Sequence, residues 1–338
     1  MNKKRIVIAF VFLCVAVLLL VIDLPTQKHY LEESGLAFGT IYHITYENVE
    51  NKSLQKNVDS LLLQVDASLS MFNQNSVIAK INRNDSVVVD SFFVAVFEKA
   101  EAVSRISDGA FDITVAPLVN AWGFGFKTPQ EVSQNTIDSL LQLVDYRKVA
   151  LTDGKIQKAD ARIQLDASAI AKGFGSDVVA HYFDQCGIDN YMVEIGGEVV
   201  AKGVNKTGHA WRIGINKPVD DSTSLQNDIQ EIIELRSGGL ATSGNYRNFY
   251  IKNGKKYAHT INPKTGFPVD HNLLSATIIA KDCVTADAFA TACMVLGLDK
   301  SLQLCESYPD IDGFFVYGDG DSFITVYSNG FEKYMRKK

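Results

Sequence analysis

The sequence predicts an α+β fold in which mixed or antiparallel sheets pack against helices. Helical and extended segments are interleaved along the chain, but without the strict β-α alternation of a doubly wound sheet. Extended segments concentrate in the second half, where Asn253-Gly254 is typical of a tight turn between antiparallel strands. Because 46% of the 338 residues are hydrophobic, the chain can form a sizeable core. We expect one folded domain over 35–338.

The N-terminal segment, 1–22, differs from this globular pattern. Three basic residues at 3–5 precede an uncharged apolar run at 6–22, which is at the short limit for crossing a bilayer. Its length also fits a secretory signal, but no A-x-A-like cleavage site follows. This favours a retained membrane anchor over a cleaved signal peptide. The basic residues place the N-terminus in the cytoplasm. Either alternative puts the domain, after a polar linker at 23–34, outside the cytoplasm.

Apolar periodicity and turn residues predict the elements of the first half. Apolar side chains recur at helical spacing over 52–69, and a similar pattern fills 91–107. Asp153-Gly154 between alternating residues predicts a hairpin, and Ser168 is of the residue type preferred at helix N-caps. In order, we predict a strand at 36–46, helices at 52–69, 91–107 and 135–144, a hairpin at 149–158, and a helix from 168 to about 186.

The second half is predicted to be richer in strands. Strand-forming residues alternate with short polar segments, and Gly297 is of the type that ends a helix. In order, we predict strands at 191–195, 198–202, 211–215 and 229–236, a hairpin at 249–261, a strand at 275–280 and a helix at 284–296.

The strongest local signal for chemistry lies on the predicted helix at 284–296. Asp287 and Thr291 are four residues apart, so they project from one helical face. One carboxylate and one hydroxyl, joined by a carbonyl and by phosphate oxygens, would suit Mg²⁺, which prefers oxygen ligands. The alternative is an aspartate stabilised by the helix dipole, beside a buried threonine. Spacing alone leaves both open.

A second signal is the sequence D-A-S-A-I-A-K-G at 166–173. Asp166 ends an extended segment, and Lys172 lies in a predicted helix start made of small residues. Free backbone N–H groups at such a start attract anions, and Lys172 adds positive charge. The alternative is a plain strand-to-helix turn with a good cap.

Two further segments could carry function. The segments D-G-A-F-D at 108–112 and W-G-F-G at 122–125 combine glycines with aromatic residues, which suits a loop against a flat ring or an apolar loop packed on the core. His259 ends a predicted strand just before a turn. It is the best candidate for a general base because imidazole titrates near neutral pH, although a histidine at a strand end can also be structural.

Other chemistries are not indicated. The sequence lacks G-x-S-x-G, the P-loop pattern, H-E-x-x-H and a clean G-x-G-x-x-G at a strand-to-helix turn. The glycines of I-G-G-E at 195–198 lie between two predicted strands and indicate a bulge or tight turn. A net charge of −6, with no basic run beyond the N-terminus, argues against a nucleic-acid partner.

Taken together, the motifs resemble those of the FAD:protein FMN transferases, also called the ApbE family. The resemblance runs over residues 36–300, and several of the motifs are long and distinctive. They are F-G-T near 39, S-M-F at 70–72, D-G-A-F-D at 108–112, D-A-S-A-I-A-K-G at 166–173, I-G-G-E at 195–198, T-S-G-N-Y-R at 242–247, H-T-I-N-P-K-T-G at 259–266 and A-D-A-F-A-T-A at 286–292.

The resemblance implies a two-lobed fold that binds FAD and Mg²⁺ in a cleft between the lobes. Family members transfer the FMN moiety of FAD to a Thr or Ser hydroxyl of a target protein and release AMP. Their targets are typically extracytoplasmic subunits of redox-driven ion pumps. The chain would then be an enzyme anchored in a bacterial inner membrane, with its catalytic domain facing the periplasm. Hydrolysis of FAD to FMN and AMP, and FAD binding without catalysis, are the alternatives.

The resemblance also implies roles for single residues. His259 would stand near the reacting phosphates, and either His259 or Asp287 would be the catalytic base. Phe38 stands where family members commonly have Met, and Asn262 stands where Asp is commoner. The metal ligands would be the Ala169 carbonyl, Asp287 and Thr291. The FAD contacts would be Phe38, Phe72, Ala110, Phe111, Asp112, Asp166, Lys172 and Ile261.

Overall fold

The computed structural model describes residues 29–48, 50, 52–125, 132–218, 228–245, 249–252, 255–320 and 322–336. The anchor predicted at 1–22 lies outside these residues, as does the first half of the predicted linker, 23–28. None of the helices that the structure describes is long and apolar enough to cross a membrane.

The first element is a hairpin rather than the single strand that the sequence predicts there. β1 (Tyr30–Ala37) pairs antiparallel with β2 (Thr40–Glu47). The chain reverses at Phe38 and Gly39, which have φ angles of 52° and 74°. No polar turn residue interrupts the apolar alternation at this point, so the periodicity runs through the turn and hides it. Because β1 begins at Tyr30, residues 30–34 belong to a strand and not to the linker.

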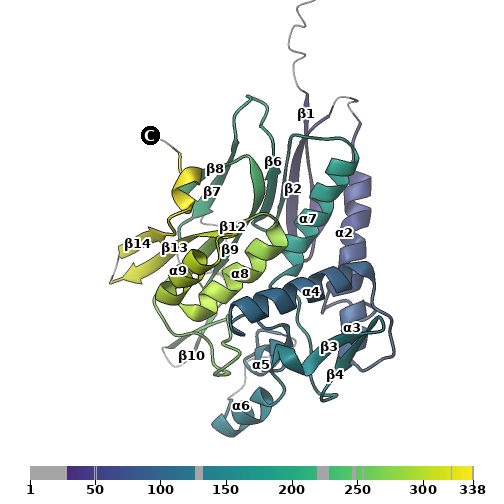
Figure 1. The fold of residues 1–338 in the computed structure, drawn as a ribbon, viewed down its shortest axis with the longest axis vertical. Helices are drawn as coiled ribbons and strands as arrows, with labels where there is room; N and C mark the ends of the chain where they lie inside the picture. The colour runs from purple at the N-terminus through teal and green to yellow at the C-terminus, as the bar shows by residue number, and fades with distance from the viewer. Residues whose placement is uncertain are drawn as a thin grey trace, which may run out of the picture.

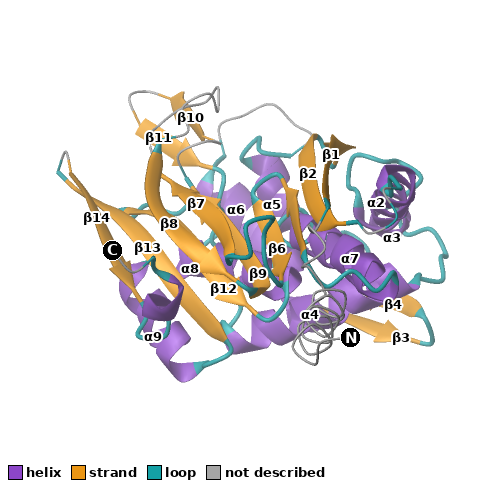
Figure 2. Cartoon of the chain, turned by 90° about the horizontal axis from the view of Figure 1, so that it is seen from above, coloured by secondary structure: helices purple, strands orange, loops and turns teal. Residues whose placement is uncertain are grey.

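An antiparallel sheet forms the centre of the molecule (Figure 2). Among the described residues it has eight strands in the order β1-β2-β5-β6-β9-β12-β13-β14, and each neighbouring pair is antiparallel. The further strands are β5 (Tyr191–Ile195), β6 (Glu198–Lys202), β9 (Ser237–Gly244), β12 (Leu273–Ala280), β13 (Ile311–Asp319) and β14 (Ser322–Tyr327). Along the chain, helices occur between these strands at irregular intervals, which is typical of an α+β fold.

Helices cover one face of this sheet (Figure 1). The central pair is α7 (Ala171–Gln185) and α8 (Cys283–Leu296), and their neighbours are α2 (Gln55–Leu69), α4 (Ser91–Ile106) and α9 (Leu298–Ser307). Almost every residue of α8 is buried, as expected for an apolar helix between a sheet and other helices. Its four alanines, at 286, 288, 290 and 292, let α8 pack closely.

A smaller hairpin covers part of the opposite face. β7 (Trp211–Asn216) pairs with β8 (Ile229–Leu235), and Ile213 and Ile233 pack on Leu240 and Phe314 of the central sheet. The core is therefore made of three layers, and the sheet is buried on both sides at its centre.

Most of the remaining elements form a second lobe at one end of the molecule, below α4 in Figure 1. It has its own apolar cluster, which contains Leu118, Trp122 and Ile137. The elements are α3 (Val77–Asn82), α5 (Ala116–Ala121), α6 (Gln134–Leu141), β3 (Val149–Thr152), β4 (Lys155–Lys158), β10 (Phe249–Lys252) and β11 (Lys255–Ala258). This arrangement confirms the predicted α+β class.

Further differences from the prediction lie at one helix boundary and in the elements that had no prediction, which are α3, α5, α9, β9, β13 and β14. Ser168 is not the cap of α7, which begins at Ala171; the Ser168 N–H instead donates to Asp166 Oδ1 at 2.7 Å. β9 had no prediction of its own because its glycines, Gly238, Gly239 and Gly244, weaken the pattern of a strand. Gly239 is required there, since a Cβ would lie 2.3 Å from the Cys283 N atom at the start of α8.

Candidate active site

The described residues enclose a cavity of about 730 Å³ where the second lobe meets the sheet and its helices. This volume lies in the range of pockets that bind small molecules and cofactors. With one exception, the residues predicted to act in the site line this cavity. They are Phe72, Ala110, Phe111, Asp112, Asp166, Ala169, Lys172, His259, Ile261, Asp287 and Thr291.

Phe38 is the exception, because it is not among the residues that line the cavity. Its ring packs instead against α7, where a Cβ on Gly175 would lie 2.5 Å from it. It also contacts two apolar clusters of the core. The turn at Phe38 therefore supports α7, and the structure does not bring this side chain to the other predicted site residues.

Asp287 and the start of α7 make a specific contact inside the cavity. The Gly173 N–H donates to Asp287 Oδ2 at 3.0 Å. Gly173 is the third residue of α7, so its N–H has no acceptor within the helix, and Asp287 supplies one. Ala169 lies just before α7 and lines the same cavity. Gly173 is needed for the contact, because a Cβ would lie 2.5 Å from the Cys283 carbonyl oxygen and 2.8 Å from Asp287 Cβ.

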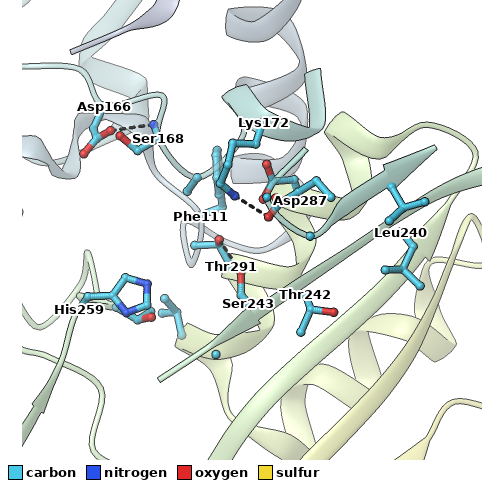
Figure 3. A pocket seen from close by; sticks show the side chains of 18 of the residues that line it. Phe111, Asp166, Ser168, Lys172, Leu240, Thr242, Ser243, His259, Asp287 and Thr291 are labelled. Carbon is cyan, nitrogen blue, oxygen red and sulfur yellow. Dashed lines mark hydrogen bonds and ion pairs between the residues drawn. The ribbon is translucent and has the colours of Figure 1, made fainter. Parts of the chain in front are cut away.

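Thr291 lies one turn further along α8, on the same side as Asp287 (Figure 3). Its hydroxyl is 3.1 Å from the Ser243 hydroxyl of β9. Thr242, the neighbouring residue on β9, also lines the cavity, and its hydroxyl is 2.8 Å from that of Thr277. Two hydroxyl groups, those of Ser243 and Thr291, thus lie together at the cavity, whereas that of Thr242 is directed to Thr277.

Lys172 pairs with a carboxylate that the sequence did not single out. Its Nζ lies 2.5 Å from Glu198 Oε1 in β6. Glu198 follows a turn at Gly196 and Gly197, whose φ angles are 63° and 104°, as the two glycines of I-G-G-E predicted. Its backbone carbonyl accepts a hydrogen bond from the Ser176 hydroxyl of α7 at 3.1 Å. The ion pair therefore joins α7 to the sheet at the cavity.

Burial and mutual charge perturb this cluster. Burial raises the pKa of Glu198 to about 7, an effect that Lys172 opposes and Asp287 reinforces. Burial also raises the pKa of Asp287 above its ordinary value, against the opposing effects of Lys172 and the Gly173 N–H. Burial alone would lower the pKa of Lys172, but Glu198 and Asp287 outweigh it and raise that pKa. Two carboxyl groups thus lie near one ammonium group. A bound cation would balance the negative charge that the ammonium group leaves uncompensated.

The oxygen atoms at this corner fit Mg²⁺. They are a main-chain carbonyl, a carboxylate and a hydroxyl, all hard ligands, and the charge balance favours a cation. Within the described part of the chain, no three His, Cys, Asp or Glu side chains gather as metal ligands. Such an ion would need further oxygens from a substrate or water, as Mg²⁺ at phosphate sites commonly does. The ligands would be the Ala169 carbonyl, Asp287 and Thr291.

The loops after α2 and α4 contribute an apolar wall with one structural carboxylate. Phe111 and Ala110 are buried at the cavity, whereas Phe72 is 71% exposed beside it. Asp112 accepts hydrogen bonds from the Thr114 N–H and hydroxyl and from the Tyr146 N–H, at 2.6–2.8 Å. Both of its oxygens are therefore used to shape the loop, and burial raises its pKa.

His259 approaches the cavity from another direction, as Figure 3 shows. Its ring contacts Phe124 edge-on, with centroids 6.4 Å apart. The turn that follows is held by Asn262, whose Oδ1 accepts hydrogen bonds from the Lys264 and Thr265 N–H groups. The amide thus fixes the turn in the way a carboxylate at this position would, so Asn262 keeps Ile261 and His259 in place.

The family model for ApbE matches residues 38–315. The chain belongs to the ApbE family. Two curated relatives named FAD:protein FMN transferase, from Haemophilus influenzae and Vibrio cholerae, are each 35% identical to it over 322 residues. The first match covers 90% of this chain and 91% of the relative, and the second covers 93% and 94%.

Solved ApbE structures share the fold. The flavin transferase ApbE from Vibrio cholerae is 33% identical, with a TM-score of 0.81 over 91% of this chain and 100% of that chain. The apo form of the Pseudomonas stutzeri flavinyl transferase ApbE is 31% identical, with a TM-score of 0.82 over 93% and 99%. This ApbE chain therefore has the α+β fold that its motifs implied.

Sequence reasoning missed several residues of this ApbE cavity. Glu198 is the most informative of them. It is the first of four consecutive buried residues in β6, and a charged residue is rarely buried in this way. That burial could not be read from the sequence, since it depends on α7 and β9. Ser243 was part of a recognised motif, but nothing in the sequence indicated its contact with Thr291.

Proposed function

We propose that this protein transfers the FMN moiety of FAD to a threonine or serine hydroxyl of a target protein, with Mg²⁺ as cofactor, and releases AMP. The observation that carries the proposal is the buried Asp287 carboxylate, which accepts the Gly173 N–H and lines one cavity together with Ala169 and Thr291. Lys172 and His259 face the same cavity. The names of the relatives, FAD:protein FMN transferase, agree with it.

The reaction exchanges one phosphorus–oxygen bond for another. The oxygen of the acceptor hydroxyl attacks the phosphorus of the FMN half and forms a new bond, while the bond from that phosphorus to the bridging oxygen breaks. AMP leaves with the bridging oxygen, and the hydroxyl proton passes to a base. Asp287 is 3% exposed and already accepts the Gly173 N–H, so His259 is the better placed base.

The remaining residues bind and orient the substrate. Lys172 offers its ammonium group to the diphosphate, and the apolar wall of Phe111 receives a flat ring. When bound, Mg²⁺ would offset the negative charge that develops on the phosphate oxygens. Positioning and electrostatics of this kind supply most of the rate in phosphoryl-type transfers.

We also propose that segment 1–22 anchors the enzyme in a bacterial inner membrane, with the catalytic domain in the periplasm. The basic residues at 3–5 before an uncharged apolar run support this orientation. The target would then be an extracytoplasmic flavin-carrying subunit of a redox pump.

The direct test is flavin transfer in vitro. The full-length protein in detergent is incubated with FAD, Mg²⁺ and a purified redox-pump subunit that carries a candidate acceptor threonine. We expect covalent flavin fluorescence on the subunit after denaturing electrophoresis, an added mass equal to one FMN moiety, and an equal amount of AMP. A subunit with the acceptor threonine replaced by valine is the control. AMP and free FMN in equal amounts, with no labelled subunit, would instead identify an FAD hydrolase.

A further inference from the structure

Glu198 has one carboxylate oxygen that no described residue contacts by a hydrogen bond. Its side chain is 3% exposed and lines the cavity. Oε1 is bonded to Lys172, but Oε2 is buried and has no hydrogen-bond partner among the residues that the structure describes. A buried polar atom of a native protein is nearly always hydrogen-bonded, and leaving it unpaired is costly. An unpaired acceptor at a cavity therefore indicates a donor on the ligand.

The backbone around Glu198 keeps this oxygen in a fixed position. β6 pairs with β5 on one side and β9 on the other, so Glu198 starts a strand in the middle of the sheet. The Ser176 hydroxyl bonds its carbonyl, and Lys172 holds Oε1. With its neighbours fixed, Oε2 is a preformed acceptor, which is the arrangement expected of a recognition group.

The chemistry of Oε2 limits the group it can bind. A carboxylate oxygen repels a phosphate oxygen and accepts from a neutral N–H or O–H group. Lys172, in direct contact with the same carboxylate, attracts the phosphates. The partner of Oε2 is thus a neutral donor next to the diphosphate. In a dinucleotide, the groups next to the diphosphate are the hydroxyls of the two sugar units, the ribityl chain of the FMN half and the ribose of the AMP half.

We propose that Glu198 is a substrate-recognition residue whose Oε2 accepts a hydrogen bond from a sugar hydroxyl of the dinucleotide, beside the diphosphate held by Lys172. The inference rests on the proposed function, because it assumes that FAD occupies the cavity. A site built to bond a hydroxyl discriminates strongly against an analogue that lacks it. Glu198 would thereby select dinucleotides by their sugar as well as by their charge.

The alternative role for Glu198 is to hold Lys172 in place and nothing more. The two roles differ in one measurable quantity, the coupling between the side chain and the hydroxyl. If Glu198 only orients Lys172, its removal weakens FAD and a deoxy analogue by the same factor. If Oε2 bonds the hydroxyl, the loss of binding free energy on removing both the Glu198 carboxylate and the hydroxyl is not the sum of the two separate losses.

The experiment is a double-mutant cycle on the full-length protein with Mg²⁺ and no target protein. Dissociation constants are measured for FAD, for FAD analogues that each lack one ribityl hydroxyl, and for the analogue with 2′- or 3′-deoxyribose in the AMP half. We expect the wild type to bind one analogue about ten- to a hundredfold more weakly than FAD, as for a lost hydrogen bond to a charged group. Glu198→Met should bind that analogue and FAD within about twofold of each other.

The analogue that loses affinity identifies the sugar unit. Glu198→Gln keeps the volume of the side chain and replaces a charge-assisted bond with a weaker neutral one. The ratio of its dissociation constant for that analogue to its dissociation constant for FAD should therefore fall below the wild-type ratio. This variant serves if Glu198→Met does not fold. Glu194→Gln is the matched control, because the carboxylate of Glu194 also lines the cavity but already accepts the Gly197 N–H at 2.9 Å. Its ratio should equal that of the wild type.

Two results would overturn the inference while leaving the proposed function intact. One is wild-type protein that binds FAD and every deoxy analogue equally well. The other is a Glu198 variant that keeps the full wild-type ratio. A wild type that binds no FAD at all would overturn both the inference and the proposed function.

Discussion

The two oxygens of the Asp287 carboxylate have different tasks. Oδ2 accepts the Gly173 N–H and so fixes α8 against α7, whereas Oδ1 accepts no hydrogen bond from the described residues. A buried carboxylate with one oxygen held and one open to a cavity is suited to bind a cation that the substrate also contacts. The same group therefore serves packing and chemistry.

Asp287→Asn separates these tasks. The amide oxygen can still accept the Gly173 N–H, so the fold should persist, but the negative charge for the cation is lost. We expect the rate of FMN transfer to fall about a hundredfold or more, as for loss of an electrostatic group at a phosphoryl site. Initial rates of FMN transfer over a range of Mg²⁺ concentrations measure this decrease. Asp299→Asn, which removes an exposed carboxylate in the first turn of α9, is the control for the loss of a charge. Unchanged rates at saturating Mg²⁺ would remove Asp287 from the metal site.

Lys172→Met tests the binding of the diphosphate. The change keeps the length of the side chain and removes the ammonium group, so FAD should bind about ten- to a hundredfold more weakly. The rate at saturating FAD should fall less, since Lys172 contacts the substrate before and during the reaction. Fluorescence titration and transfer kinetics give the two values. Lys206→Met, which removes an exposed lysine paired with Glu32, is the control. Normal FAD affinity in Lys172→Met would contradict the assignment.

The sequence could predict residues whose role depends on local spacing. Asp287 and Thr291 are one helical turn apart, and Asp166 and Lys172 belong to one short motif, so both pairs were found. Glu198 depends on the approach of α7 to β6, and its pairing with Lys172 joins residues 26 positions apart. Phe38 belongs to a motif that matched, but a tight turn directs its ring to Gly175 and away from the cavity. Motif identity thus did not determine the direction of the side chain.

At the scale of elements, the contact between α7 and α8 positions the site. Besides the Gly173–Asp287 bond, Asp177 of α7 accepts the N–H groups of Cys283 and Val284 at 2.9 and 2.7 Å. These N–H groups belong to the first turn of α8 and have no partner within the helix. The two contacts together fix the position of α8 relative to the first turns of α7.

Asp177 also makes the stability of this contact depend on pH. Burial raises its pKa to about 7, although the N–H groups of Cys283 and Val284 oppose the shift. The unfolded value is about 3.9. Since the folded pKa is the higher one, the folded state binds more protons between these values. Its contribution to stability is complete below about pH 4, declines as pH rises to about 7 and is constant above.

Asp177→Asn removes this titration. The free energy of unfolding of the wild type, minus that of the variant, should therefore decrease from pH 5 to pH 7, by at most about 1.4 kcal/mol per pH unit. Urea unfolding at each pH measures this difference. A difference that does not change with pH, or that increases, would show that the carboxylate is ionised throughout this range.

Secondary-structure prediction succeeded where a single hydrophobic periodicity continued through the whole segment. The helices at 55–69 and 91–106 and the hairpin at 149–158 appear within a few residues of their predicted positions. It failed where the chain reversed inside an uninterrupted apolar pattern, as at Gly39, and where close packing required glycines, as in β9. In both cases the tertiary contact, and not the local preference, selected the residue type.

At the scale of the molecule, the cavity joins parts of the chain that are far apart in sequence. Phe72 comes from the loop between α2 and α3, Phe111 from the loop after α4, Lys172 from α7, and Asp287 from α8. The order of the motifs along the chain carries no information on this convergence; it follows from the antiparallel sheet, whose central strands bring both helices to one place. A ligand that contacts both lobes should therefore stabilise the whole fold.

FAD and Mg²⁺ should stabilise the protein cooperatively. Each ligand binds the native state, and the proposed metal site is completed by oxygens of the diphosphate, so each ligand should raise the affinity for the other. We expect FAD with Mg²⁺ to raise the melting temperature by several degrees more than the sum of the two separate shifts. Differential scanning fluorimetry measures this, and excess EDTA should remove the additional shift. AMP, which has no diphosphate, should show none, and neither should FAD with the Asp287→Asn variant. Purely additive shifts would mean that the metal and the diphosphate do not meet, because reciprocal coupling is required of two ligands that share a contact.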